Sequence, residues 1–197
     1  MSRTRLAVLV SGGGRSLENL AERSAAGELD VELVLVLSSS PTAFALERAR
    51  RLGIPSVTVD PREHAGPSEF SAAAWRAIES SGAELVVLAG FLRLLLVPEA
   101  WRGRVINIHP SLLPRYGGKG FYGDRVHRAV LAAGERESGC TVHYVTNEYD
   151  KGDVLVQRRV PVLPGDDEHT LGARVFEEER IALPEAISLH LRSRSAH

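Results

Sequence analysis

The chain has 197 residues, of which 44% are hydrophobic and 25% charged, and its formal net charge is -1 at pH 7. This length and composition are ordinary for a globular protein and allow one α/β domain with a sizeable core. The nearly balanced charge argues against a protein that coats nucleic acid. No apolar run reaches the roughly 18 residues that a membrane span needs, so no membrane partner is expected.

Two further features bear on the compartment. Cys140 is the only cysteine, so an internal disulfide is excluded and a reducing cytoplasm is expected. The N-terminus leads directly into an apolar strand pattern and lacks the features of a signal peptide. We expect Cys140 to be a small buried packing residue and not a reactive thiol.

The first half of the chain alternates between apolar runs and helical patterns. Residues 6–10 form an apolar run that ends in Ser11-Gly12-Gly13-Gly14, as expected of a buried parallel strand that enters a glycine-rich turn. Further strands are expected at residues 31–37, 56–59, 85–89 and 105–109. Helices are expected at residues 16–26, 44–52 and from Pro67 toward Gly82, the last with Ser68 as its candidate N-cap. This alternation indicates an open, mostly parallel, wound sheet.

The pattern changes after residue 114. Residues 115–124 contain four glycines and indicate a loop, which a short helix at 125–133 follows. Two more strands are expected at residues 141–145 and 154–162, at least one of them antiparallel. Residues 170–192 indicate a closing helical region that Pro184 should kink or split. With no internal repeat or linker, we expect a single domain over residues 1–197.

The glycine-rich turn has the character of an anion site. Its backbone N–H groups can approach a ligand, and the following helix favours negative charge at its N-terminus. It does not fit a dinucleotide fingerprint, because Leu17 stands where the third glycine would fall. Lys119 is followed by Gly120, so the second glycine-rich segment is not a Walker loop either. We favour a phosphate monoester as the ligand; the alternative is a tight turn that binds nothing.

Asn107 and His109 lie on the last strand of the alternating region, which Pro110 stops. Because side chains alternate along a strand, both should point to one face while Ile106 and Ile108 point to the other. This places an amide donor beside an imidazole at a strand terminus, where open α/β sheets bind their ligands. The alternative is a strand end with two polar residues that face solvent.

Four segments carry a resemblance to a known family: residues 11–14, 86–93, 107–114, and 141–145 leading to Asp150. In this order they resemble the phosphoribosylglycinamide formyltransferases, folate-dependent enzymes of purine biosynthesis, from about residue 5 to about residue 190. The resemblance implies a Rossmann-like formyltransferase fold with antiparallel C-terminal strands. It also implies a phosphate-binding half over residues 1–100 and a catalytic and folate-binding half over residues 101–197.

The implied reaction is transfer of a formyl group from 10-formyltetrahydrofolate to the amine of glycinamide ribonucleotide, through a tetrahedral oxyanion. Asn107 can donate to the oxyanion, and His109 is the natural proton carrier or cationic stabiliser. A carboxylate beside His109 would raise its pKa and hold its orientation. The resemblance places this carboxylate at Asp150, a choice that spacing alone could not make over Glu148 or Asp153.

The resemblance also assigns the binding residues. The acceptor phosphate is assigned to Gly13, Gly14, Arg15 and Ser16, with Glu179 at an acidic position of the family. The folate is assigned to Leu92, Arg93, Leu94, Leu95 and Asn107, with Arg93 as partner for the folate glutamate. From the residues alone, the alternative for this second segment is a buried strand that continues into a helix.

Several positions depart from the family pattern. The family commonly has Ser-Asn in place of Arg15-Ser16, and a Lys where this chain has Phe176. We hypothesise that Arg15 supplies the missing cation, since guanidinium binds phosphate bidentately; whether the acceptor also differs is open. A second family arginine is replaced around Pro67, which weakens the case for recognition of the glutamate tail.

The remaining expectations concern the loop and other polar residues. Residues 117–126 form a longer loop than in better-known members, and we interpret it as a mobile lid over the His109 side. His127 and His143 match family positions but stay outside the catalytic set. No Cys, His or carboxylate cluster has metal-ligand spacing, so no metal is expected.

Three alternatives stay open. A formyltetrahydrofolate hydrolase shares the catalytic core, but the regulatory domain that precedes it is not expected, because the first strand begins at residue 6. Relatives that formylate a sugar nucleotide or aminoacyl-tRNA are longer than this chain. A catalytically silent phosphate- or folate-binding module is the third. The expected partners are small-molecule substrates; a homodimer is compatible with the sequence, which does not determine the oligomeric state.

Overall fold

The computed structural model describes residues 3–195, and the chain divides into two compact units. The first unit ends at Ile106 and the second begins at Asn107, so the boundary falls within strand β5 (Val105–His109). The functional division into residues 1–100 and 101–197 stays a prediction.

The first unit is built on four strands. They are β1 (Thr4–Val10), β2 (Val31–Ser38), β3 (Ser56–Thr58) and β4 (Leu85–Ala89), in the order β3-β2-β1-β4. All three pairings between these strands are parallel, and Leu6 lies opposite both Leu33 and Leu85. A strand that is covered on both faces reads as a continuous apolar run, and residues 6–10 of β1 are buried throughout. The four strands expected in this region are confirmed, with β3 ending one residue earlier than predicted.

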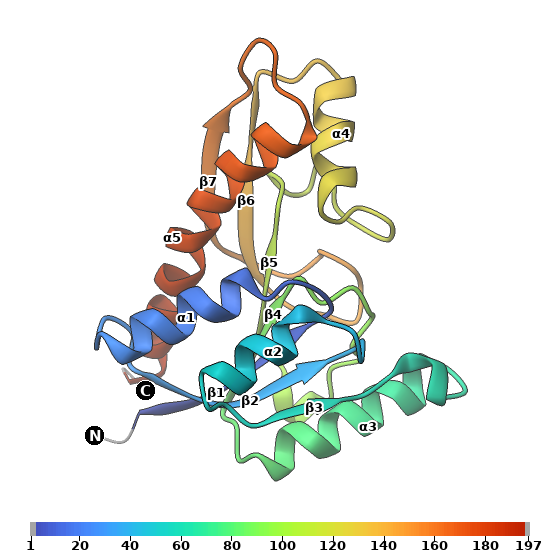
Figure 1. The fold of residues 1–197 in the computed structure, drawn as a ribbon, viewed down its shortest axis with the longest axis vertical. Coiled ribbons are helices and arrows are strands. Elements are labelled where there is room, and N and C mark those ends of the chain that lie inside the picture. Colours follow the sequence, from blue (N-terminus) through green and yellow to red (C-terminus); the bar gives the residue numbers. More distant parts are fainter. Residues whose placement is uncertain (1–2, 196–197) are drawn as a thin grey trace. The chain divides into compact units, whose positions relative to one another are not determined.

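Helices α1 (Arg15–Ala25), α2 (Phe44–Arg51) and α3 (Pro67–Ser80) connect these strands. Right-handed crossovers from β1 through β2 to β3 place α1 and α2 on one face of the sheet, and the return from β3 to β4 places α3 on the other. Helices α1 and α2 contact each other and lie next to each other in Figure 1. Two short 3-10 turns, η1 (Pro61–Glu63) and η2 (Glu99–Trp101), complete the unit.

The expected cap of α3 is wrong. The helix begins at Pro67, and Gly66 occupies the N-cap position without a side-chain hydrogen bond. Proline is well suited to the first helical position, because its fixed φ is helical and it has no N–H that would lack a partner. Ser68 is therefore already inside the first turn and cannot serve as the N-cap.

The second unit pairs two long strands with two helices. Strands β6 (Glu137–Tyr144) and β7 (Val154–Pro161) are antiparallel, with register from Glu137 opposite Pro161 to His143 opposite Val154. This confirms the antiparallel expectation, although β6 begins four residues earlier than predicted, at 137 and not 141. Helix α5 (Glu168–Ser195) packs against both strands and against α4 (Asp124–Ala132), and it runs beside β7 in Figure 1.

Helix α5 continues through Pro184 as one element, so the predicted split is not observed. Proline removes one hydrogen bond from a helix interior and disfavours it locally. Here Leu183, Ala186 and Ile187 around it are almost fully buried. Burial of this apolar stripe against the strands outweighs the local penalty of the proline.

The hydrogen-bonded strand order through both units is β3-β2-β1-β4-β5-β6-β7. Parallel pairing in the first unit and the antiparallel β6–β7 pair in the second confirm the predicted fold class, an open, mostly parallel wound sheet with antiparallel C-terminal strands.

Cys140 lies within β6 and is fully buried. Burial raises the pKa of its thiol to about 12, with further increases from the charges of Glu179 and Glu178. The thiolate, which is the reactive form, is therefore suppressed at neutral pH. This confirms the prediction of a packing residue.

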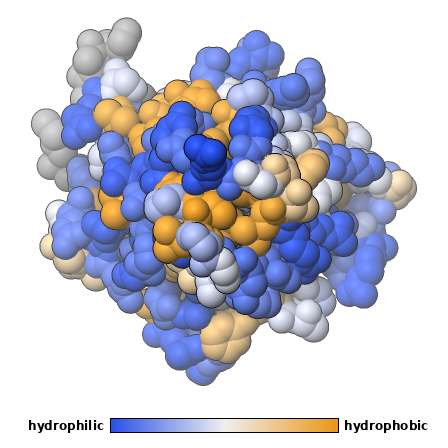
Figure 2. Space-filling model, turned by 90° about the horizontal axis from the view of Figure 1, so that it is seen from above, coloured by the Kyte–Doolittle hydropathy of each residue, from blue (hydrophilic) through white to orange (hydrophobic). Residues whose placement is uncertain are grey.

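The surface contains both hydrophilic and hydrophobic residues (Figure 2). Figure 2 shows a face that is largely hydrophilic, with hydrophobic residues gathered near its middle. Exposed apolar residues are common on folded proteins and mark no site by themselves. Between residues 3 and 195, no helix is both long enough and apolar enough to cross a membrane.

Candidate active site

Strand β5 carries the two polar side chains that the sequence singled out. His109 is only 5% exposed, and Asn107 is half-buried. Ile106, which precedes Asn107, and Ile108, which lies between Asn107 and His109, are both buried, as the alternation of a strand predicts. The alternative of a histidine facing solvent is therefore excluded.

Asp150 comes to the same place from a loop 43 positions beyond Asn107. Its Oδ1 lies 3.4 Å from Nδ2 of Asn107 and 3.6 Å from Nδ1 of His109. Its Oδ2 accepts a 2.8 Å hydrogen bond from the backbone N–H of Gly118. The three residues predicted to be catalytic thus lie together within the second unit.

The local backbone explains how the loop brings this carboxylate inward. Asp150 has φ 55, in the left-handed region that aspartate tolerates better than most residues. A Cβ at Gly152 would collide with the carbonyl group of Tyr144, so only glycine lets the loop pass this close to the end of β6. The two acidic residues that spacing could not distinguish from Asp150, Glu148 and Asp153, are both exposed.

His143 also belongs to this cluster, and sequence reasoning had left it outside. Its Nδ1 lies 2.8 Å from the carbonyl oxygen of Tyr144, which can only accept, so Nδ1 carries the proton. Nε2 is then an acceptor for the Asn107 amide at 3.1 Å, and it lies 3.5 Å from Oδ1 of Asp150. The sequence alone could not predict this contact, because that requires knowing that the end of β6 lies beside β5.

The same reasoning assigns the tautomer of His109. Its Nε2 lies 2.8 Å from the backbone oxygen of Tyr116 and therefore donates to it. In the neutral ring, Nδ1 then carries the lone pair and faces Asp150. At 3.6 Å this second contact is within ion-pair range but too long for a hydrogen bond.

The pKa of His109 depends on the expected effect of the carboxylate and on a larger effect of burial. Burial lowers the pKa of His109, and this effect outweighs the increases caused by the charge of Asp150 and the Tyr116 carbonyl. The expectation that the carboxylate raises the pKa of His109 is confirmed, but the net shift is downward because loss of hydration disfavours the cation more than the carboxylate favours it. At neutral pH the imidazole is mainly neutral and can accept a proton.

At Asp150 the neighbouring groups outweigh burial, whereas at His109 burial outweighs them. Burial raises the pKa of the Asp150 carboxyl group, but the neighbouring His143, the charge of His109 and the Gly118 N–H together hold it below the usual value. A carboxylate that stays ionised beside a neutral imidazole can stabilise the imidazolium when it forms.

The glycine-rich turn lies in the first unit, between β1 and α1. Gly14 occupies the N-cap position of α1 with φ 75, and a Cβ there would lie 2.6 Å from Cβ of Ala45. Gly13 is exposed with open space around it, and Arg15 and Ser16 begin the helix. The N-terminal end of this helix is thus next to open space, as an anion site requires.

A cation near this turn escaped the sequence reasoning. Nε of Arg48, on α2, donates a 2.9 Å hydrogen bond to the carbonyl oxygen of Gly13, and its guanidinium also pairs with Glu18. This hydrogen bond connects α2 to the glycine-rich turn. No pattern in the sequence linked α2 to the turn.

The predicted folate segment leaves β4 without becoming a helix. Gly90 turns the chain with φ 73, and residues 91–98 form neither helix nor strand, which excludes the strand-to-helix alternative. Leu92 is 46% exposed and its N–H donates to Oγ of Ser11 at 2.9 Å, whereas Leu95 is buried. Arg93 is exposed, and its charge helps lower the pKa of Asp60 to about 2, after the larger effect of Arg62.

Glu179 and Phe176 lie on α5 in the second unit, and both are half-buried. The charge of Glu179 contributes to the raised pKa of Cys140, which places it near the buried face of β6. Over the described residues 3–195, no group of three or more His, Cys, Asp or Glu residues could hold a metal ion.

Comparison with known proteins adds independent information. Residues 4–187 match a family model described as formyl transferase. The chain is 42% identical over 191 residues to the trifunctional purine biosynthetic protein adenosine-3 of Drosophila melanogaster, covering 95% of this chain and 14% of that protein. It is 39% identical to the chloroplastic phosphoribosylglycinamide formyltransferase of Arabidopsis thaliana, covering 90% and 62% respectively. The chain therefore spans less than two thirds of the length of these curated relatives.

Solved structures agree in fold. The crystal structure of glycinamide ribonucleotide transformylase 1 from Symbiobacterium toebii matches with a TM-score of 0.91 and 37% identity, covering 98% of this chain and 90% of that one. Phosphoribosylglycinamide formyltransferase from Bacillus halodurans matches with a TM-score of 0.87 and 28% identity, covering 98% and 97%.

Proposed function

The chain belongs to the formyl transferase family and, within it, to the phosphoribosylglycinamide formyltransferases, and on this premise we propose that it transfers a formyl group from 10-formyltetrahydrofolate to the amine of glycinamide ribonucleotide in purine biosynthesis. The observation that carries the proposal is the meeting of Asn107, His109 and Asp150 around one carboxylate oxygen. An amide donor, a neutral imidazole and an ionised carboxylate are the groups that acyl transfer to an amine needs.

Asn107 stabilises the oxyanion in this scheme. One N–H of its amide is held by Nε2 of His143 at 3.1 Å. The other has only the weak 3.4 Å contact with Asp150 and is available to the formyl oxygen as negative charge develops on it. A donor of this kind is worth about 3 kcal/mol in the transition state.

His109 moves the proton. The amine nitrogen attacks the formyl carbon, and the bond between that carbon and the folate nitrogen breaks. Because Nε2 of His109 already donates to Tyr116, Nδ1 is the atom that takes the proton from the attacking amine and returns it to the leaving nitrogen. Asp150, 3.6 Å from Nδ1, stabilises the imidazolium in between.

We assign substrate binding as the resemblance implies. Gly13, Gly14, Arg15 and Ser16 hold the acceptor phosphate, with Arg15 supplying the cation that Phe176 cannot, and Glu179 completes the acceptor set. The open N-terminal end of α1 supports this assignment. The folate is bound by Leu92, Arg93, Leu94, Leu95 and Asn107, with main-chain groups of residues 92–95 for the pterin ring and Arg93 for the glutamate.

Further parts of the proposal follow from the chemistry. The reaction uses 10-formyltetrahydrofolate as co-substrate and needs no metal, so a chelator should leave the rate unchanged. The single buried cysteine suits a cytoplasmic enzyme. Small molecules are its partners, with no nucleic acid or membrane.

The deciding experiment follows loss of formyl from the folate with and without glycinamide ribonucleotide. Loss that accelerates only when the amine is present supports transfer. Equal rates support a formyltetrahydrofolate hydrolase. Turnover only with another phosphorylated amine would mean a different acceptor.

A further inference from the structure

The carbonyl that receives Nε2–H of His109 belongs to a residue in an uncommon conformation. Tyr116 has φ 56, in the left-handed region that residues with a side chain rarely adopt. Its carbonyl oxygen lies 2.8 Å from Nε2 of His109. A non-glycine residue keeps such a conformation where surrounding contacts hold it.

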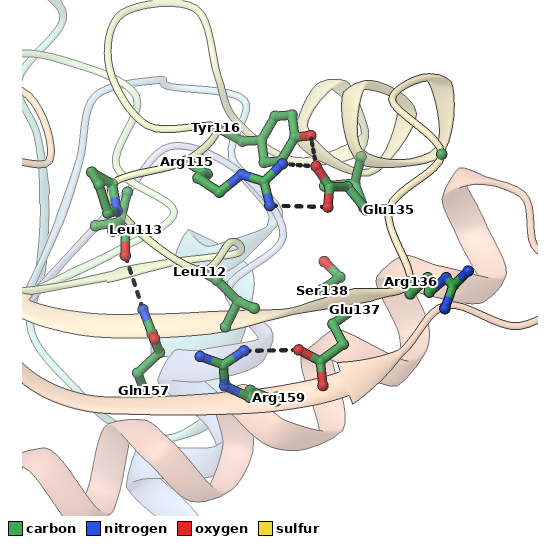
Figure 3. Close-up of a pocket in the computed structure, with 13 residues that line it drawn as sticks. Leu112, Leu113, Arg115, Tyr116, Glu135, Arg136, Glu137, Ser138, Gln157 and Arg159 are labelled. Carbon is green, nitrogen blue, oxygen red and sulfur yellow. Dashed lines mark hydrogen bonds and ion pairs between the residues drawn. The ribbon is translucent and has the colours of Figure 1, made fainter.

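Those contacts converge on one carboxylate. The hydroxyl of Tyr116 donates to Oε1 of Glu135 at 2.8 Å, and Nη1 of Arg115 donates to Oε2 of the same side chain at 2.9 Å. Glu135 lies just after α4, so one residue holds two consecutive side chains of the loop (Figure 3). A third bond, from Oγ of Ser111 to the carbonyl oxygen of Arg115 at 2.7 Å, orients the peptide group that precedes Tyr116.

These side chains also border open space. Arg115, Tyr116 and Glu135 line a cavity of about 500 Å³ within the second unit. Figure 3 shows the three residues on one side of it and a second ion pair, between Glu137 and Arg159, on the other. The hydroxyl bond to Glu135, the edge contact with the ring of Phe121 and the Arg115 guanidinium over the Tyr116 ring together restrain where Tyr116 lies.

We propose that Glu135 is a positioning residue for His109: by binding Arg115 and Tyr116 together, it presents the Tyr116 carbonyl to Nε2 and keeps the imidazole in the tautomer whose Nδ1 faces Asp150. The proposal deepens the proposed function and rests on it for its kinetic consequences. Glu135 acts through Tyr116 and needs no contact with substrate.

The kinetic test uses two variants that disrupt the hydrogen bond between Tyr116 and Glu135 and leave Asn107, His109 and Asp150 unchanged. Tyr116→Phe removes only the hydroxyl, and Glu135→Gln removes the charge that binds Arg115 and Tyr116. We expect kcat to fall about tenfold in each, with KM for both substrates unchanged. The double variant should lose no more than either single one, because all three interrupt the same linkage.

The pH profile separates positioning from general weakening of the fold. The Tyr116 carbonyl raises the pKa of His109, so the inflection of that histidine should move to lower pH in both variants. Glu137→Gln is the matched control, since Glu137 lines the same cavity but pairs with Arg159 at 2.8 Å. Unchanged kcat and pH profile in Tyr116→Phe and Glu135→Gln, or an equal change in Glu137→Gln, would overturn the proposal.

A second measurement needs no turnover. Nitrogen-15 NMR of labelled protein reports the tautomer of His109 directly: we expect Nε2–H in the wild type and a mixture in Glu135→Gln. An unaltered tautomer in that variant contradicts the positioning role even if the enzyme is active. A wild type that transfers no formyl group would instead overturn the proposed function, and the NMR result would still decide the role of Glu135.

Discussion

The backbone N–H of Gly118 donates a 2.8 Å hydrogen bond to Oδ2 of Asp150, while Oδ1 of the same carboxylate faces His109. The glycine-containing loop at residues 115–124 thus contacts Asp150, the residue that we assign to stabilise the imidazolium. Gly117 contributes by its lack of a side chain, because a Cβ there would lie 3.2 Å from Cβ of Asp150. The interpretation of residues 117–126 as a mobile lid stays a prediction, and in the conformation observed here the loop supports the carboxylate.

Replacing the charge of this carboxylate tests its role. Asp150→Asn keeps an oxygen that can accept from Gly118 but removes the negative charge beside His109. We expect kcat to fall roughly 100-fold. Because the Asp150 charge raises the pKa of His109, the inflection of the histidine should move to lower pH. Steady-state rates across pH would measure both effects.

Glu148→Gln and Asp153→Asn are matched controls for this variant, since both acids are exposed residues of the same loop. Each should retain wild-type kinetics. A comparable loss of kcat in either control would mean that the charge of the loop as a whole, and not Asp150, supports the reaction.

The contact between Asn107 and His143 leads to a second prediction. Asn107→Ala should lower kcat by a few hundredfold, which corresponds to about 3 kcal/mol for an oxyanion donor. His143→Ala should lower it less, because the amide remains but loses the acceptor that orients it at 3.1 Å. In a double-mutant cycle, the effects should be less than additive. Full additivity would show that His143 acts independently of Asn107.

Arg15 provides a test of acceptor binding. A charge-assisted hydrogen bond is worth about 1.5–3 kcal/mol, so Arg15→Ala should raise the KM for glycinamide ribonucleotide by about tenfold to 100-fold while KM for the folate stays constant. Arg51→Ala, on the exposed surface of α2, serves as the charge-matched control. An unchanged KM for the amine in Arg15→Ala would refute the idea that Arg15 supplies the missing cation.

The glycines of the turn differ in what they contribute to stability. Gly14→Ala would put a methyl group 2.6 Å from Cβ of Ala45 and force a side chain onto a residue with φ 75. We expect a loss of about 2–4 kcal/mol in the free energy of unfolding. Gly12→Ala should cost less than about 1 kcal/mol, since nothing lies within 4 Å of its added Cβ. Denaturant unfolding of both variants would check this, and equal losses would contradict it.

Two buried histidines predict how stability depends on pH. Burial is the largest cause that lowers the pKa of both His109 and His127 below the usual histidine value of 6.5. The unfolded chain therefore binds protons at a higher pH than the folded one, so unfolding takes up protons and stability falls as pH falls below about 6.5. Thermal unfolding should show a lower Tm at pH 5.5 than at pH 7.5. His127→Gln should reduce this difference, and a Tm independent of pH over that range would contradict the prediction.

Local periodicity was sufficient to predict most elements of the fold. Largely apolar runs identified β1, β2 and β4, because burial on both faces of a parallel sheet leaves few polar positions. Alternation on β5 was likewise sufficient to place Asn107 and His109 on one face. Where local rules were wrong, at the cap Ser68 and in the split expected at Pro184, the deciding factors were the conformation of the neighbouring Pro67 and the burial of apolar side chains in α5.

The sequence by itself therefore determined the order of strands and helices, and its resemblance to a family named the residues of the candidate site. Only the tertiary structure showed that His143 contacts Asn107, that the Tyr116 carbonyl determines the tautomer of His109, and that the pKa of this histidine is lowered. The physical reason is that periodicity reflects neighbours a few positions apart. Hydration and hydrogen bonding of a buried group depend on every segment that surrounds it, wherever those segments stand in the chain.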